Sequence, residues 1–247
     1  MISAMSFLKV FLLDHPRIEL DGVVISFPRR KVLALFIYLV VTGRTHNRDS
    51  LSAFLWPEYD SAKASANLRR NLSILKSLIP ENLLQIFRDE VVISKHPELF
   101  SDIERLHFCV SFATDHDHPD DTGCDECIDL LFEATELYGA GFLAGFSLRD
   151  SRQFDEWQTL QSEICSREVI SAYQMLVSSL YAKSDYEQAL VCTENWINLD
   201  PLNEFAHRQL MVLQAESGRR SDALRQYGKL KNLLESELQV SPDEETR

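Results

Sequence analysis

Two histidines and two cysteines lie close together in the acidic segment HDHPDDTGCDEC near the middle of the chain. The H-x-H and C-x-x-C pairs supply borderline and soft ligands of the kind that bind zinc in a tetrahedral site. Four protein ligands leave no open position for catalysis, so such a zinc ion would be structural. The candidate ligands, in a loop expected over residues 115–127, are His116, His118, Cys124 and Cys127.

Other interpretations of this segment stay open. The five aspartates of residues 115–127 are also typical of a solvated acidic loop, and Cys127 can pack as the first apolar residue of a following helix. The loop can also be a metal-sensing or redox-sensing element. Structural zinc is therefore the one candidate cofactor, and metal analysis of the native protein tests it.

Residues 61–80 form a basic segment, which is the second part of the chain whose side chains can make specific contacts. It carries four cations and no acid, in a chain with a net charge of −13. Its outward face alternates long cations with small residues, so Arg70 can reach a guanine edge and Asn67 an adenine edge in a DNA groove. The alternative is an ordinary solvated helix face. The apolar stripe that would orient this helix consists of Ala64, Leu68, Leu72, Leu75 and Ile79.

No set of residues predicts catalysis. The glycine-rich GAGFLAGF lacks the spacing and the preceding strand of a phosphate-binding loop. Carboxylate pairs such as Asp155-Glu156 lie in long helical segments, where solvated faces explain them. We therefore expect that the chain is not an enzyme, because nothing supplies a nucleophile with a positioned base.

The first part of the chain must supply the elements that hold the basic helix. Strand-like runs separated by Asp21-Gly22 predict a small antiparallel sheet over residues 7–27. A nearly all-apolar helix follows and ends at Gly43. A short helix comes next, and the basic helix begins at Asp60 or Ser61.

The runs LLQIF and VVIS on either side of Arg88 predict a hairpin over residues 83–94, with this arginine at its tip. Strands, three helices and a terminal hairpin make a winged helix-turn-helix. In that fold the third helix enters the major groove, while the second helix and the wing contact phosphates. The candidate DNA-binding residues are Arg44, Thr45, His46, Arg48, Lys63, Asn67, Arg69, Arg70, Ser73, Lys76 and Arg88.

The rest of the chain is predicted to be an all-α, tetratricopeptide-like repeat domain. SDYEQAL from Ser184 and GRRSDAL from Gly218 are related by a shift of 34 residues, which also places Leu176 over Leu210. Pro201 lies where that repeat ends. Stacked repeats leave a concave face for partners. An unspecialised helical bundle is the alternative.

Charge divides the chain into the same two parts. Residues 1–100 hold 13 Lys and Arg against 10 Asp and Glu, and residues 101–247 hold 12 against 28. An acidic second part repels DNA and suits protein partners. We expect domains at residues 1–97 and 98–247.

The chain has no evident secretory signal, and its longest apolar run, Val32–Val41, is about half of a membrane crossing. We therefore expect a cytoplasmic protein with no membrane partner. Its five cysteines are an odd number, more consistent with reduced thiols than with disulfides.

Two long motifs carry a resemblance to a known family. The segment from RRKVLALFIYLVV to NLSILKSLIP resembles the DNA-binding half of the Streptomyces antibiotic regulatory protein (SARP) family. FLAGFSLRDSRQFDEW and the two helical repeats up to ESELQVSPDEETR resemble the bacterial transcriptional activator domain of that family. The resemblance covers about residues 7–247.

The resemblance implies a bacterial transcriptional activator whose winged helix binds direct repeats near promoters. It also implies that the helical domain supports a homodimer and contacts RNA polymerase. Many relatives continue into an ATPase, so we expect that this chain is part of a longer signal-responsive regulator. By position, Lys63, Asn67, Arg70 and Ser73 fall on the recognition helix of the family, with Arg48 and Arg88 on its supporting helix and wing.

Two features depart from the family pattern. Asn71 and Ile74 occupy positions where outward basic or polar side chains would be comfortable, so the base preference stays open. The His/Cys loop is an addition that compact family members do not need. A signalling adaptor, in which the winged helix docks proteins and does not read DNA, is the alternative function.

Overall fold

The computed structural model describes residues 7–117 and 123–247. The chain folds into two compact units. The first comprises residues up to His107 together with Leu137–Ser166, and the second comprises Phe108–Glu136 and Arg167–Arg247. Mixed strands and helices in the first unit and paired helices in the second confirm the predicted fold class. The domain limits 1–97 and 98–247 stay a prediction.

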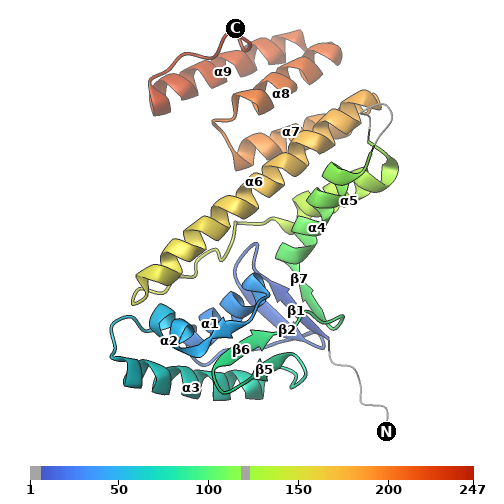
Figure 1. Ribbon diagram of the computed structural model, residues 1–247. Coiled ribbons are helices and arrows are strands. Elements are labelled where there is room, and N and C mark those ends of the chain that lie inside the picture. The colour runs from blue at the N-terminus through green and yellow to red at the C-terminus, as the bar shows by residue number, and fades with distance from the viewer. Residues whose placement is uncertain (1–6, 118–122) are drawn as a thin grey trace. The chain divides into compact units, whose positions relative to one another are not determined.

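The first unit opens with a sheet that joins distant parts of the chain (Figure 1). As predicted, β1 (Leu8–Phe11) pairs antiparallel with β2 (Arg17–Leu20), but β3 is only Val23–Val24 where a longer strand was expected. The sequence did not predict β7 (Leu99–Ser101), which pairs parallel with β1 and puts Leu99 opposite Leu8. A three-residue strand has no periodicity to recognise, and only its distant partner defines it.

A buried carboxylate fixes the junction between this sheet and the next helix. Asp102 follows β7, and its Oδ2 accepts hydrogen bonds from the backbone N–H groups of Leu12, at 2.6 Å, and Leu13, at 2.9 Å. Burial of the side chain outweighs these hydrogen bonds and raises the pKa of Asp102 to about 6.

The apolar helix α1 (Arg30–Thr42) is central to the first unit, as predicted from its composition. Its buried residues include Val32, Leu35, Phe36 and Leu39, which lie on several sides of the helix. It ends at Gly43, whose φ of 57° is the left-handed conformation that glycine adopts without strain.

The helix-turn-helix and the wing follow, close to the predicted bounds. The helices α2 (Arg48–Leu55) and α3 (Ser61–Leu78) begin after Asn47 and Asp60, whose side chains accept hydrogen bonds from first-turn N–H groups. The wing is the hairpin of β5 (Leu84–Ile86) and β6 (Glu90–Ile93), and β4 (His46–Asn47) pairs with β6 as a third strand.

Residues 137–166 complete the core of the first unit. The start of α6 (Arg152–Ala182) brings Trp157 against Tyr38, with ring centroids 5.0 Å apart, and Phe154 against Phe54, at 6.1 Å. The Ser151 hydroxyl donates to the carbonyl oxygen of Phe54, at 2.8 Å. The winged helix is therefore covered by chain that lies far along the sequence.

The second unit is helical. It contains the end of α4 (Asp102–Asp115), α5 (Asp125–Leu137), the second half of α6, α7 (Tyr186–Leu199), α8 (Glu204–Glu216) and α9 (Arg220–Leu238). The helices pair as the 34-residue repeat predicts, with the equivalent residues Leu176 and Leu210 both buried. None of the helices in residues 7–117 and 123–247 is long and apolar enough to span a membrane.

Candidate nucleic-acid interface

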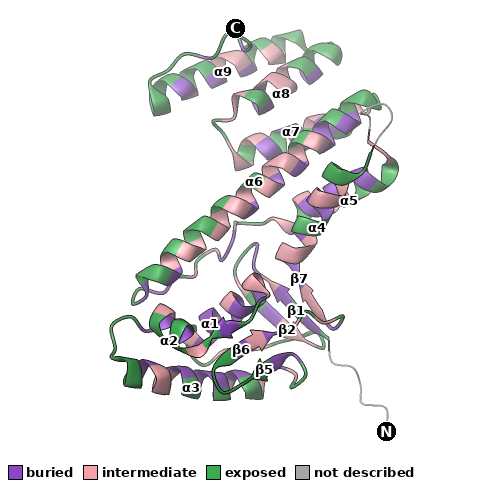
Figure 2. Ribbon diagram, in the orientation of Figure 1, coloured by how far each residue is buried: buried purple, intermediate pink, exposed green. Residues whose placement is uncertain are grey.

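The outward face of α3 carries most of the residues that the sequence singled out for DNA contact. Its other face buries the predicted stripe, including Leu68, Leu72 and Leu75, so one side of the helix is fixed against the core (Figure 2). Asn67 is half-buried at the edge of the outward face. The exposed members are Lys63, Arg69, Arg70, Ser73 and Lys76.

Asn67 and Arg70 lie side by side on this face. The Nη1 of Arg70 is 3.4 Å from the Oδ1 of Asn67, which accepts its hydrogen bond. The two side chains suited to reading bases therefore project from adjacent turns of one helix.

Asn71 does not point outward, although its position in the sequence suggested that it would. Only 4% of the residue is exposed, and its Nδ2 donates to the backbone carbonyl of Asn67, at 2.7 Å. Ile74 is half-buried. Neither residue therefore belongs to the exposed face of α3.

One flank of α3 meets the wing and the start of α2. The backbone N–H of Arg48 donates to Asp89, at 2.9 Å, and its guanidinium donates to the carbonyl oxygen of Phe87, at 3.1 Å, so this arginine is tied to the wing. Arg48, Arg69 and Arg88 line a shared hollow of about 340 Å³. Three cations from separate elements therefore converge beside α3, together with Asp49 and Asp89.

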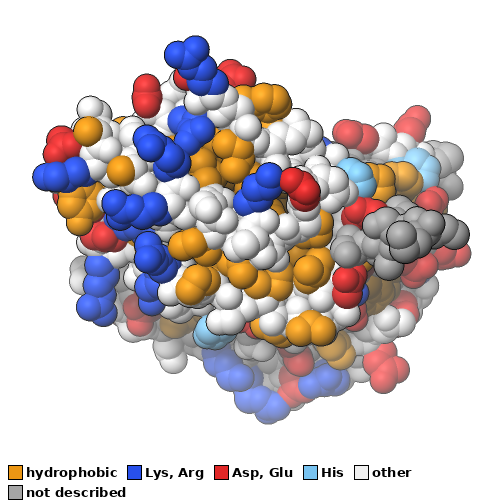
Figure 3. Space-filling model, turned by 90° about the horizontal axis from the view of Figure 1, so that it is seen from below, with side chains coloured by type: hydrophobic (Ala, Val, Ile, Leu, Met, Phe, Trp, Pro, Cys, Tyr) orange, Lys and Arg blue, Asp and Glu red, His pale blue; other side chains and the backbone are white. Residues whose placement is uncertain are grey.

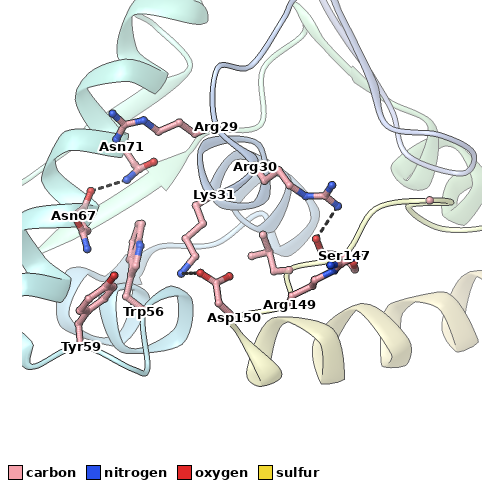
Figure 4. A pocket seen from close by; sticks show the side chains of 12 residues that line it. Arg29, Arg30, Lys31, Trp56, Tyr59, Asn67, Asn71, Ser147, Arg149 and Asp150 are labelled. Carbon is pink, nitrogen blue, oxygen red and sulfur yellow. Dashed lines mark hydrogen bonds and ion pairs between the residues drawn. The ribbon is translucent and has the colours of Figure 1, made fainter.

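The opposite flank of α3 has a second cationic surface around a hollow of about 710 Å³ (Figure 4). Arg29, Arg30 and Lys31 enter it from the start of α1, and Arg149 from the loop before α6. Lys31 is neutralised by Asp150, at 2.9 Å. Among the residues that the structure describes, Arg29 has no ion-pair partner.

Sequence reasoning missed this second surface. The run Arg29-Arg30-Lys31 at the start of the apolar helix is a visible signal, because three successive cations stand out against the apolar residues that follow them. Arg149 has no local signal, since its placement depends on the packing of residues 137–166 against the winged helix.

The turn between α1 and α2 meets the prediction only in part. Arg44 and Thr45 are exposed. His46 is buried, with its Nε2 2.6 Å from the Thr42 hydroxyl and its ring against Tyr38. Burial, assisted by nearby Arg44, lowers the pKa of His46 below its usual value. Its ring is part of the core, which argues against the predicted phosphate contact.

Two of the exposed lysines on α3 already have acidic neighbours. Lys63 lies 3.2 Å from Asp60, and Lys76 lies 2.9 Å from Glu81. Exposed pairs of this kind contribute little and exchange readily for other anions. Lys and Arg side chains gather on the face seen in Figure 3, with apolar side chains between them.

The structure brings three of the four predicted zinc ligands together, in the second unit. Metal-ligating atoms of His116, Cys124 and Cys127 all lie within 4.8 Å of one another. Burial, with the nearby Cys124 thiol, raises the pKa of Cys127 to about 11. The fourth predicted ligand, His118, lies outside the described residues.

Comparison with solved structures gives a fold relative. The chain matches Mycobacterium tuberculosis EmbR, whose structure was determined in complex with a low-affinity phosphopeptide, with a TM-score of 0.75 and 21% sequence identity. The match covers 98% of this chain and 63% of the EmbR chain, so this chain spans less than two thirds of that protein. At this identity the likeness establishes the fold alone. No curated protein sequence matches the chain.

The sequence itself gives the family. Residues 102–247 match the bacterial transcriptional activator domain, which is more than half of the chain. This match and the shared fold confirm the predicted resemblance to SARP-like regulators that carry this domain. The chain therefore belongs to the bacterial transcriptional activator domain family, a family of transcriptional regulators.

Proposed function

We propose that the chain is a sequence-specific, double-stranded-DNA-binding activator that reads its site with the outward face of α3. The observation that carries this proposal is the distribution of cations around that helix. Arg48, Arg69 and Arg88 lie on one flank, and Arg29 and Arg149 line the hollow on the other. A helix in the major groove has a phosphate backbone on each side, which this arrangement matches.

Base reading falls to Arg70 and Asn67, with Lys63 and Ser73 beside them on the exposed face. A guanidinium can donate two hydrogen bonds to guanine, and a carboxamide can pair with adenine. The phosphate-facing group comprises Arg44, Thr45, Arg48, Arg69, Lys76 and Arg88, to which we add Arg29 and Arg149. His46 leaves this group because its ring is buried.

The helical repeats are the proposed surface for RNA polymerase and for a second copy of the chain, in the cytoplasm. A hollow of about 640 Å³ between α7, α8 and α9 is lined by both acidic and basic side chains, including Glu194, Arg225 and Lys229. The acidic side chains in this hollow repel a nucleic acid, so a protein is the more suitable partner.

The test is selection of bound fragments from genomic DNA, followed by titration of the selected duplex against random DNA. We expect clear preference for the selected duplex at near-physiological salt. Equal binding to every duplex, or none, would contradict the proposal. The polymerase contact is tested separately, by transcription from the selected promoter with purified RNA polymerase.

A signalling adaptor is the second candidate function. It is favoured by the exposed apolar side chains of the wing, where Phe87 is 52% exposed and Ile86 is 36% exposed. An apolar wing tip suits a protein surface. Formation of dimers by a chain that binds no DNA would support this alternative.

A further inference from the structure

A histidine and two cysteines converge where α4 ends and α5 begins. The Nδ1 of His116 lies 3.1 Å from the Sγ of Cys127 and 3.5 Å from the Sγ of Cys124. One ring nitrogen therefore faces both sulfur atoms. Among the described residues this is the one such cluster of metal-ligating side chains.

Local backbone structure holds the three residues in place. The N–H of His116 donates to the carbonyl oxygen of Phe112, which extends the last turn of α4. Cys124 directly precedes α5, and its carbonyl oxygen accepts from the N–H of Ile128, so both cysteines lie on the first turn of that helix. The three ligands thus come from the ends of two helices.

Gly123 allows the chain to reach this position. It has a φ of 65°, and a Cβ atom there would lie 2.5 Å from the hydroxyl oxygen of Ser179 in α6. Only glycine combines that conformation with such a close approach to another helix. The turn that delivers Cys124 is therefore closely specified by the sequence.

The spacing of the ligand atoms suits a tetrahedral zinc ion. Zinc binds thiolate sulfur at about 2.3 Å and imidazole nitrogen at about 2.0 Å, which puts the two ligand atoms about 3.5 Å apart. The observed separations of 3.1 and 3.5 Å are near that value. The backbone N–H of Cys127 also lies 3.5 Å from the Sγ of Cys124, an outer hydrogen bond that would stabilise a thiolate.

We propose that His116, Cys124 and Cys127 bind one zinc ion, which joins the end of α4 to the start of α5. The two thiols release their protons to solvent when the ion binds. Three protein ligands leave a fourth tetrahedral position to another ligand. His116 and Cys127 also line a hollow of about 740 Å³, which gives ions a route to the site.

A dithiol that cycles through a disulfide is the main competing role for a C-x-x-C pair on the first turn of a helix. Both cysteines are free thiols in this structure. Such a pair has no need of an imidazole nitrogen near both sulfur atoms, whereas the ligands of one zinc ion must lie at about the observed separations.

The test is metal analysis of the full chain, purified without an affinity tag that binds metal. Mass spectrometry is expected to find one zinc per chain, and cobalt exchanged into the site is expected to give a thiolate charge-transfer absorption band. Cys124→Ser should lose both signals. Cys192→Ser is the matched control, because Cys192 is a buried thiol in α7 away from the cluster.

His116→Ala provides a second variant that does not disturb the core, since His116 is exposed. It should reduce zinc content to near zero with the helical circular dichroism unchanged. Absence of zinc and of the cobalt band in the wild-type chain would overturn the proposal. A Cys124–Cys127 disulfide in chain purified without reductant, with no bound metal, would also overturn it and favour the redox role.

Discussion

The α3 surface and the His/Cys cluster use side chains in opposite ways. On α3, Arg70, Lys63 and Ser73 diverge from one helix into solvent, and cations on both flanks extend the surface. At the cluster, His116 and Cys127 come from two helix ends and face each other at 3.1 Å. Diverging groups suit a ligand larger than the helix, such as a duplex, whereas converging groups suit a single ion.

A change in salt concentration is expected to produce the largest difference between the two sites in their affinity for ligands. With about six phosphate contacts, raising salt from about 50 to 200 mM should weaken DNA binding on the order of 10³-fold. Metal binding at the cluster should hardly change, because its bonds are short and coordinate. Fluorescence anisotropy with labelled duplex and the cobalt absorption band measure the two responses. Salt-independent DNA binding would show that the cations around α3 do not contact phosphates.

Asp102 shows that polar groups can converge without binding a ligand. Its carboxylate accepts hydrogen bonds from backbone N–H groups of the chain itself. Its pKa of about 6 exceeds the unfolded value of 3.8, so the folded state binds the proton more tightly. Its stabilising contribution is complete below pH about 4 and is lost as pH rises through about 6. The loss is about 3 kcal/mol.

Asp102→Asn removes this titration. Denaturant titrations at each pH should therefore show that the difference in free energy of unfolding between the variant and the wild-type chain shifts by about 2.4 kcal/mol between pH 4 and pH 7. A difference that stays constant with pH would show that burial does not disfavour the carboxylate.

Arg70→Ala tests whether the exposed face of α3 recognises the base sequence of DNA. Loss of a bidentate guanine contact should weaken binding to the selected duplex by about 2 kcal/mol, or about 30-fold, and leave random DNA nearly unaffected. Arg88→Ala is the matched control from the wing. It should weaken binding to both duplexes alike, by a few-fold, and lower the salt slope by about one. Equal effects of the two substitutions would argue against base reading by Arg70.

Gly123→Ala tests how far the His/Cys cluster depends on the backbone conformation of the turn before Cys124. Gly218 also has a positive φ, of 75°, but nothing lies within 4 Å of the Cβ that alanine would add there. Both substitutions should strain the backbone, and Gly123→Ala should cost about 1 to 2 kcal/mol more, because it also meets Ser179. Chemical denaturation measures the difference, and zinc content should fall only in Gly123→Ala. Equal costs would mean that the turn is not closely packed.

Much of this organisation was predictable because it depends on local sequence. The caps at Asn47 and Asp60, the stop at Gly43 and the apolar stripe of α3 follow from residue chemistry within one or two turns. The convergence of His116 with the cysteines was predicted from spacing alone.

The remainder depends on distant parts of the chain. His46 lies in a polar turn of the sequence and was expected to be exposed, but the Thr42 hydroxyl and the Tyr38 ring enclose it. Arg149 reaches the flank of α3 only because residues 137–166 pack on the winged helix. The pairing of β7 with β1 joins residues about ninety positions apart. Nothing local in the sequence marks such partners.

The discontinuity of the first unit has a consequence for how the protein is made. Its winged helix precedes the second unit in the chain, yet its aromatic core is closed by Phe154 and Trp157. Ribosomes deliver the chain from its N-terminus, and distant pairings form late in folding. The core of the nascent winged helix therefore stays partly uncovered until the start of α6 has emerged from the ribosome. Synthesis thus passes through an interval in which α3 has emerged but the aromatic residues that close the core of its unit have not.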